Sequence, residues 1–149
     1  FRALSATLDA GNAHLAAELL GIAQESFDRT LQYMKERKQF GALIGSFQAL
    51  QHRAAHWWSE IELCKSVVLK SLQALDEGDV KSPALASIAK AKLCEVAELS
   101  TNEAIQIHGG IGMTDEYEIG FFIKRARPAQ MLYGDYNYHA NRFALLSGY

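Results

Sequence analysis

Apolar residues recur every three or four positions along most of the chain, and this spacing constrains the fold more than any other feature. The cleanest run extends from Leu43 to Leu75 in near-heptad register, and a later one extends from Leu85 to Ile107. A first run covers residues 3–38, and its apolar stripe consists of Leu4, Leu8, Leu15, Leu19, Ile22, Leu31 and Met34. A period near 3.6 residues places these side chains on one face, which predicts three long amphipathic helices.

Residues that favour helix ends lie between these runs. Gly78 can end the second helix in the left-handed conformation. Ser82 and Pro83 offer an N-cap and a first-turn proline for the third helix. The third helix is expected to stop at the stretch HGGIG, residues 108–112, where three glycines let the backbone turn sharply.

Shorter helices follow the third run. Asp115 can cap one of them, and Pro128 can open a last helix towards Leu146. No β-type alternation of useful length occurs, and short connections make sequential helices antiparallel neighbours. We therefore expect an all-α fold, an antiparallel up-down four-helix-type bundle with three long helices plus shorter C-terminal helices. With 49% hydrophobic residues, positions 1–149 are predicted to form one domain, and the start at Phe1, already in helical pattern, suggests a part of a longer protein.

Charge and cysteine content narrow the function classes. The net charge is only −2 and the basic residues do not gather on one face, which argues against nucleic acid or an acidic membrane surface as a partner. Cys64 and Cys94 lie within apolar helical patterns without metal-ligand spacing, as reduced core residues do. No apolar run is long enough to span a bilayer. We expect a soluble protein of a reducing compartment, the bacterial cytoplasm or the mitochondrial matrix.

The sequence gives little support for a di-metal enzyme or for a Ser-His-Asp hydrolase. Di-metal sites in bundles use Glu-x-x-His pairs, and none occurs here. His52 and His56 lie one helical turn apart but have no third ligand, so packing or surface roles are favoured over metal binding. No strand-turn-helix nucleophile elbow is present for a hydrolase. Trp57 and Trp58 can mark a partner surface, although an adjacent pair on a helix usually places one ring in the core.

Two short stretches allow both a structural and a ligand-binding interpretation. KERKQFG, residues 35–41, can be a charged helix end whose cations favour the helix dipole, or it can recognise an anion. QIHGGIG, residues 106–112, can simply end a helix, or its bare backbone can approach a phosphate or a ring closely. When each stretch is considered alone, composition favours the structural interpretation of KERKQFG. For QIHGGIG it favours neither interpretation.

In their order and spacing, these stretches resemble the C-terminal domain of the acyl-CoA dehydrogenase family. The similarity extends over nearly the whole chain and is carried by LGIAQESFDRTLQYMKERKQFGALIGSFQALQ, followed by SIAKAKLCEVAELSTNEAIQIHGGIGMTDEYEIGFFIKRARPAQMLYGD. The resemblance implies that an N-terminal helical domain and a middle β domain precede this one. It also implies a tetramer built as a dimer of dimers, with FAD shared across an interface.

The resemblance assigns cofactor-binding residues one by one. Arg37 matches the arginine that contacts the FAD pyrophosphate of a neighbouring subunit, a task suited to a guanidinium because it can grip phosphate through two parallel hydrogen bonds. Gln39 and Phe40 match positions lining the same cofactor, and Gln48 matches a glutamine on the next helix. The adenine end of FAD is expected against the turn formed by Gln106, Ile107, His108, Gly109 and Gly110.

The chemistry implied is α,β-dehydrogenation of an acyl-CoA thioester, in which a carboxylate removes the α-proton while the β-hydrogen leaves as hydride. The two positions that the resemblance implies for the base are Gly134 and Gly11, and both are glycine here. Asp135 stands beside the first and is the candidate base if the loop has shifted by one residue. Asp9 is two residues from the second, and two helical steps turn a side chain about 200° away.

Three functional hypotheses remain. The first is the C-terminal FAD-binding and oligomerisation domain of an acyl-CoA dehydrogenase that passes electrons to electron-transfer flavoprotein or a similar acceptor. The second is a catalytically weakened or non-catalytic subunit of a hetero-oligomer that serves assembly, motivated by the two glycines at the base positions. The third is an acyl-CoA oxidase relative, since the sequence does not show whether electrons pass to a protein acceptor or to oxygen.

Overall fold

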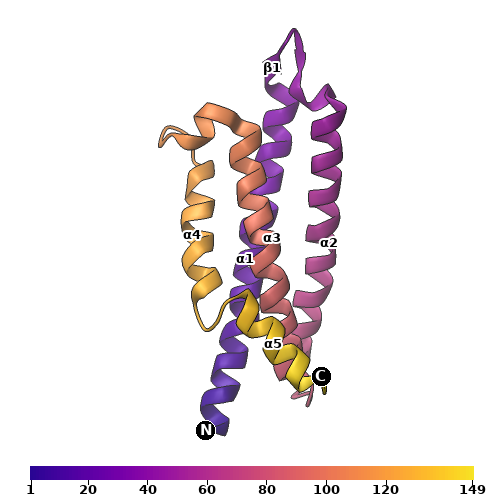
Figure 1. Cartoon of the computed structure of the whole chain (residues 1–149), viewed down its shortest axis with the longest axis vertical. Coiled ribbons are helices and arrows are strands. Elements are labelled where there is room, and N and C mark those ends of the chain that lie inside the picture. Colours follow the sequence, from indigo (N-terminus) through magenta and orange to yellow (C-terminus); the bar gives the residue numbers. More distant parts are fainter.

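The computed structural model describes residues 1–149, which fold into a bundle of five α-helices (Figure 1). The three long helices are α1 (Arg2–Glu36), α2 (Gln48–Asp76) and α3 (Ser82–His108). The shorter helices α4 (Ile119–Met131) and α5 (Tyr136–Leu146) follow. Helices α1 to α4 alternate in direction, and α5 crosses the end of the bundle that lies near the N-terminus. The predicted antiparallel all-α bundle is confirmed.

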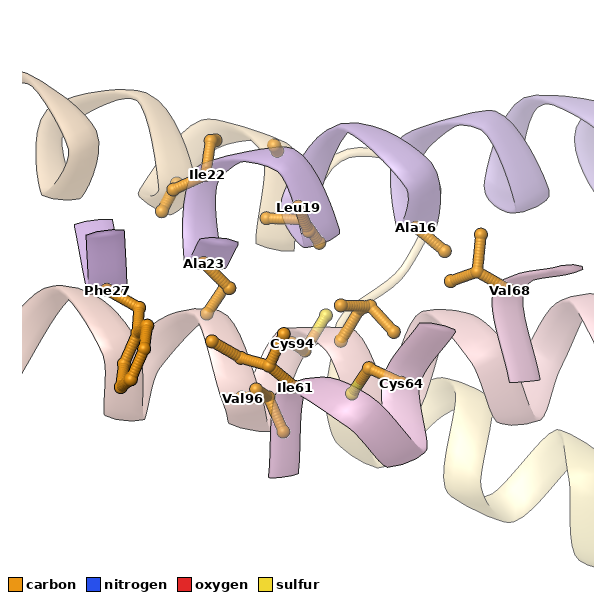
Figure 2. Packing of buried hydrophobic residues seen from close by; sticks show 14 of the residues in the cluster. Ala16, Leu19, Ile22, Ala23, Phe27, Ile61, Cys64, Val68, Cys94 and Val96 are labelled. Atoms are coloured by element: carbon orange, nitrogen blue, oxygen red, sulfur yellow. The ribbon is translucent and has the colours of Figure 1, made fainter. Parts of the chain in front are cut away.

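The core lies where α1, α2 and α3 pack together (Figure 2). Phe27 of α1 meets Trp57 of α2 edge-to-face, with ring centroids 5.0 Å apart, and the Trp57 Nε1–H donates to Ser100 Oγ of α3 at 2.7 Å. Trp58 remains 42% exposed, so one ring of the tryptophan pair lies in the core and the other beside it, as predicted. The fully buried side chains that join the three helices include Ala16, Leu19, Ala23, Ile61, Cys64, Leu93 and Ala97.

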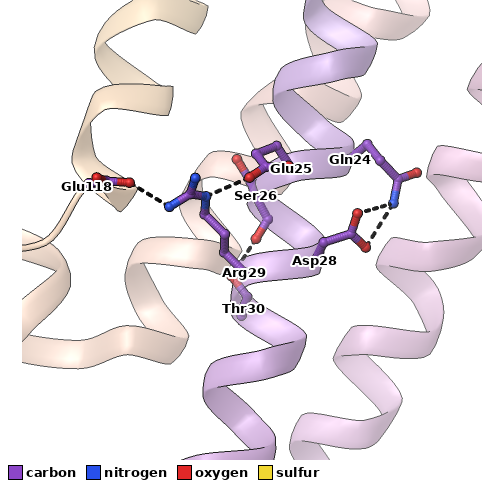
Figure 3. Close-up of polar contacts among 7 residues, drawn as sticks. All are labelled: Gln24, Glu25, Ser26, Asp28, Arg29, Thr30 and Glu118. Carbon is purple, nitrogen blue, oxygen red and sulfur yellow. Dashed lines mark hydrogen bonds and ion pairs between the residues drawn. The ribbon is translucent and has the colours of Figure 1, made fainter.

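Helix α4 is attached to α1 by polar contacts. Arg29 of α1 donates from Nε to Glu25 one turn earlier, at 2.8 Å, and from Nη1 to Glu118 at the start of α4, at 2.6 Å (Figure 3). These exposed ion pairs add little free energy individually. The Arg29–Glu118 pair lies where the start of α4 meets the C-terminal third of α1.

The connection between α1 and α2 differs from the prediction. Helix α1 ends at Glu36 rather than residue 38, and α2 begins at Gln48 rather than Leu43. Between them lie the paired strands β1 (Lys38–Gln39) and β2 (Ala42–Leu43), followed by the 3₁₀ helix η1 (Ile44–Ser46). The chain turns through Phe40 and Gly41, whose φ angles of 53° and 78° suit a tight hairpin and end any helix.

The expected helix ends are partly wrong. Ser82 is the first helical residue of α3 and makes no capping bond, although Pro83 does occupy the first turn as predicted. Asp115 does not cap α4, which starts after Glu118; instead Asp115 Oδ1 lies 3.1 Å from Lys124 Nζ. Pro128 lies inside α4 and opens no helix. The last helix α5 starts after Asp135, whose side chain caps it.

The N-terminal end of α1 protrudes beyond the bundle (Figure 1). Leu4 and Leu8 belong to the apolar stripe but are 60% and 37% exposed, because no other helix covers the first two turns of α1. None of the helices combines the length and apolarity needed to cross a membrane. The stripe becomes buried from Leu15 onward, where α1 enters the bundle.

Candidate functional site

The hairpin that follows α1 places Arg37 beyond the helix end. Arg37 has extended backbone angles, and its carbonyl accepts from the Ile44 N–H at 2.8 Å, which closes the base of the hairpin. The Arg37 side chain is exposed and forms no ion pair. Lys35 is the only basic residue in the last turn of α1. A dipole-stabilising role therefore suits Lys35 and not Arg37.

The C-terminal end of α3 forms the opposite wall of the same region. Gly109 ends the helix with φ 65°, and the short 3₁₀ helix η2 (Gly109–Met113) follows. His108 is buried, and its ring stacks on Tyr33 of α1 with centroids 4.3 Å apart. The His108 Nδ1–H donates to the Ala104 carbonyl at 2.7 Å, while Nε2 is buried without a partner. Burial lowers the pKa of His108, so the imidazole is neutral.

A cleft of about 370 Å³ separates these two walls. It is lined by every predicted cofactor-binding residue except Phe40 and Gln48, and by three residues that were not predicted to bind the cofactor: Tyr33, Ile44 and Ile111. Tyr33 stands one helical turn before Arg37, which is the only sequence signal that could have pointed to it. Segments far apart in the sequence thus converge at one end of the bundle (Figure 1).

The two predicted residues outside the cleft lie close to it. Phe40 is at the tip of the hairpin, 94% exposed, with its ring centroid 6.3 Å from that of Phe47. Gln48 is the exposed first residue of α2. Neither lines the cleft within this chain, so any contact with the same ligand has to be made outside its walls.

The chemistry of the cleft suits a phosphate-bearing ligand. Arg37 is the one charged residue that lines it, and no carboxylate is present to compete for the guanidinium. Gln39 and Gln106 supply amide groups, and a side chain on Gly110 would meet no atom within 4 Å. The open space over Gly110 lets a ligand approach the backbone directly.

The two expected base positions lie towards the other end of the bundle, beside the loop between α4 and α5 (Figure 1). Gly11 is on α1, and Gly134 is in the loop with φ 114°. Asp135 accepts a hydrogen bond from the Tyr138 N–H at 2.9 Å through Oδ1 and so caps α5. Asp9 is buried, and its Oδ1 lies 2.6 Å from Arg142 Nη1 in an ion pair whose angles do not fit a hydrogen bond.

No group of three or more His, Cys, Asp or Glu side chains is arranged to hold a metal ion. His52 and His56 are exposed on α2. Cys64 and Cys94 are both buried and unpaired, and burial raises the pKa of both thiols, that of Cys64 to about 12. The cysteines are therefore core residues, as predicted.

Comparison with known proteins places this geometry in a family. Residues 1–145 match the model of the acyl-CoA dehydrogenase C-terminal domain. The chain is a C-terminal domain of the acyl-CoA dehydrogenase family. Its relatives include the probable acyl-CoA dehydrogenase YngJ of Bacillus subtilis, 42% identical over 85% of this chain and 33% of that protein. The bovine mitochondrial short/branched chain specific acyl-CoA dehydrogenase is 35% identical over 93% of this chain and 32% of that protein.

Solved acyl-CoA dehydrogenases share the same helical arrangement. Butyryl-CoA dehydrogenase from Megasphaera elsdenii superposes with a TM-score of 0.93 at 32% identity, covering 98% of this chain and 38% of that structure. The chain thus spans about a third of the length of the curated relatives it matches. Family membership confirms the recognition made from KERKQFG and QIHGGIG, while the role of each site residue stays a prediction.

Proposed function

We propose that this domain binds FAD and supports oligomerisation in an acyl-CoA dehydrogenase that oxidises an acyl-CoA thioester to its α,β-unsaturated form. The observation that carries the proposal is the cleft of about 370 Å³, which joins Arg37 to the Gln106–Gly110 turn and leaves the guanidinium without a partner. Members of this family are flavoproteins. An arginine with no carboxylate nearby, facing bare glycine backbone, fits the pyrophosphate and nucleotide part of FAD.

Each side chain has a defined task in this proposal. The Arg37 guanidinium would hold the phosphate oxygens of FAD, and the Gln39 and Gln106 amides would orient the neighbouring polar groups. Gly109 and Gly110 admit the ligand against the backbone. FAD, when bound, supplies the acceptor for the β-hydride.

The geometry also supports sharing of FAD between subunits. Gly11 lies on α1 and Arg37 directly follows its last residue, Glu36, so at 1.5 Å of rise per residue the two are separated by about 38 Å along the helix. The cleft and the base loop of one chain are therefore too distant to be joined by a short contact. An oligomer, which we propose to be a tetramer, lets the cleft of one subunit complete the site of another.

The remaining partners follow from this function. The substrate is an acyl-CoA, and the electron acceptor is electron-transfer flavoprotein or a similar protein. We place the protein in the bacterial cytoplasm or the mitochondrial matrix, in keeping with its two unpaired cysteines. The non-catalytic alternative is favoured by a specific observation: the carboxylates near the base loop have structural partners, because Asp135 caps α5 and Asp9 pairs with Arg142.

The test uses the full-length protein with Arg37→Ala, Arg37→Lys and the control Lys38→Ala. Loss of charge-assisted hydrogen bonds is expected to weaken FAD binding about 10- to 100-fold in Arg37→Ala. Arg37→Lys should recover only part of this, because an ammonium cannot reproduce the planar fork. FAD affinity is measured by flavin fluorescence titration of the apoprotein, and folding by thermal unfolding without FAD.

The result expected is unchanged unfolding with weakened FAD binding, since Arg37 makes no side-chain ion pair within the chain. A full-length protein that never takes up FAD would overturn the proposal. Equal loss of stability and FAD affinity in Arg37→Ala would instead assign Arg37 to the helix end. Lys38→Ala should leave both quantities unchanged, because Lys38 does not line the cleft.

A further inference from the structure

Gly11 and Gly134 are the two positions that the family resemblance gives for the catalytic base. In this fold Tyr133, the residue before Gly134, brings its side chain against Gly11. The Tyr133 ring lies directly over Gly11 of α1: a methyl group on Gly11 would stand 2.9 Å from Tyr133 Cε2 and 3.2 Å from Cδ2. A real side chain at residue 11 would therefore collide with the ring. The space above Gly11 is already filled by Tyr133.

Gly134 faces a different direction. A methyl group on Gly134 would stand 2.4 Å from Tyr138 Cδ1 and 3.0 Å from His139 Nε2, so a side chain there would point into α5. Its φ of 114° is also rarely adopted by any other residue. The loop residue whose side chain shares the space above Gly11 is thus Tyr133 and not Gly134.

The nearby carboxylates are committed to structural roles. Asp135 caps α5 and lines a separate hollow of about 160 Å³ with Cys94, Arg127 and Tyr136, in which neither Gly11 nor Tyr133 takes part. Asp9 is buried against Arg142. Neither carboxylate lies in the space above Gly11.

The backbone that presents Tyr133 is fixed by side chains of two helices, α3 and α5. Lys90 of α3 is fully buried, and its Nζ donates to the carbonyls of Gln130 and Gly134, both at 2.9 Å. The His139 Nε2–H of α5 donates to the Tyr133 carbonyl at 3.2 Å. Ser87 Oγ joins the set, 3.3 Å from His139 Nδ1, and accepts from Arg142 Nη1 at 2.8 Å.

These bonds hold Tyr133 at φ 61°, a conformation that costs a non-glycine residue of order 1 kcal/mol or more. The loop backbone at Tyr133 is therefore held in a conformation that is intrinsically unfavourable for tyrosine. From this backbone the Tyr133 ring extends over Gly11.

We propose that Tyr133 occupies the place of the catalytic carboxylate, so that this chain does not remove the α-proton at its own base loop. The inference rests on the proposed function, because it concerns the proton acceptor of that dehydrogenation. A phenolic hydroxyl ordinarily keeps its proton at neutral pH and offers no anionic oxygen to accept another. Turnover therefore needs a carboxylate supplied by a different chain of the assembled enzyme.

The proposal predicts that a carboxylate introduced at residue 133 restores the missing step. In Tyr133→Glu, the new carboxylate takes the α-proton and the Cα–H electron pair becomes part of the double bond. The β-hydrogen leaves with its electrons to the oxidised flavin, so the thioester is oxidised and the flavin reduced by two electrons. Positioned general bases contribute about 10²- to 10⁴-fold, so a gain of at least 100-fold over Tyr133→Gln is expected.

The experiment compares full-length wild type, Tyr133→Glu and Tyr133→Gln, each reconstituted as a homogeneous preparation. Three quantities are measured: bound FAD by absorbance, exchange of the α-hydrogen of butyryl-CoA in D₂O, and anaerobic bleaching of the flavin. Wild type and Tyr133→Gln should retain FAD and show background exchange and bleaching, whereas Tyr133→Glu should gain both. Wild type that bleaches rapidly on its own would overturn the proposal, as would Tyr133→Glu that binds FAD and gains nothing.

A second measurement needs no activity and no cofactor. Alanine is more stable than glycine inside a helix, so Gly11→Ala should raise the thermal midpoint in a Tyr133→Ala background, whereas contact with the Tyr133 ring should cancel or reverse this gain in the wild type. Additive effects of the two substitutions would show that the ring does not lie on Gly11 and would also overturn the proposal. Failure to bind FAD would count against the proposed function alone and leave this cycle intact.

Discussion

The polar side chains near the two ends of α1 differ in whether they have partners within the chain. At the hairpin end, the Arg37 side chain forms no ion pair, and the buried Nε2 of His108 lacks a hydrogen-bond partner. At the loop end, the buried Lys90 and His139 bind backbone carbonyls, and Arg142 binds Ser87 and pairs with Asp9. The Arg37 guanidinium at the hairpin end is left without a partner, whereas the Lys90 ammonium and the His139 imidazole at the loop end hold backbone carbonyls.

This difference separates residues poised for a ligand from residues that maintain the fold. A buried polar group is costly unless it is paired, so the pairs at the loop end should matter mainly for stability. An exposed arginine without a partner contributes little to folding, and the proposed function assigns Arg37 to FAD binding. Substitutions at the loop end should change unfolding, and substitutions at the hairpin end should change FAD affinity.

The largest effect is expected from Lys90→Ala. It leaves the carbonyls of Gln130 and Gly134 unpaired in the interior and creates a cavity in place of a fully buried side chain. Each unpaired group costs about 1–3 kcal/mol, so a loss of about 4 kcal/mol in the free energy of unfolding is expected. Urea unfolding of the full-length protein measures it, with Lys70→Ala as a control because Lys70 is exposed on α2. Similar midpoints for both variants would contradict the role of Lys90.

Stability should fall as the solution becomes acidic, owing to His139. Burial lowers its pKa to about 4, against about 6.5 in an unfolded chain. Between these values the unfolded chain binds more protons than the folded one, so lowering the pH through this window destabilises the fold, by up to about 3 kcal/mol. Urea midpoints at pH 7, 5.5 and 4.5 test this. His139→Gln should flatten the pH dependence, whereas His52→Gln on the exposed face of α2 should not; equal slopes would refute the assignment.

The fold was largely predictable because long helices leave a periodic apolar pattern. The pattern located α1, α2 and α3, and it failed only where local chemistry overrode it. The turn at Phe40 and Gly41 uses two positive φ angles, but Phe-Gly lacks the Asn-Gly or Asp-Gly sequence that usually announces a hairpin. Pro128 misled because a proline can occupy an exposed helix position once neighbouring helices hold the helix in place.

The candidate site was predictable only in part. Arg37, Gln39 and the Gln106–Gly110 turn were found through their order in the chain, and the fold does gather them in one cleft. The contact between Tyr133 and Gly11 joins residues near opposite ends of the sequence, so no local pattern could reveal it. Lys90 lies in an alternating stretch of small and basic residues, which carries no sign that its ammonium is buried.

Asp135 offers a test that separates a cap from a base. As the N-cap of α5, it should cost about 1 kcal/mol when replaced by alanine, because the Tyr138 N–H loses its acceptor. Asp135→Ser keeps a capping oxygen while removing the carboxylate, so its unfolding free energy should stay within a few tenths of a kcal/mol of wild type. Turnover of the assembled enzyme should equal that of the wild type in both Asp135→Ala and Asp135→Ser. A loss of turnover in Asp135→Ser with stability intact would restore Asp135 as the catalytic base.

The smallest effect on folding, and the sharpest test of the hairpin end, is expected from Gly110→Ala. Gly110 has no positive φ, and a methyl group on it would meet nothing within 4 Å, so stability without FAD should change by less than about 0.5 kcal/mol. If FAD lies against this backbone, the same methyl group occupies the ligand's space and weakens binding. Gly78→Ala is the matched control, since φ 65° there should cost about 1 kcal/mol of stability, and Gly78 does not line the cleft, so FAD affinity should not change. Unfolding curves and FAD titrations of both variants distinguish the cases: a Gly110→Ala protein that binds FAD as tightly as wild type would mean that the glycines of the Gln106–Gly110 turn only end α3.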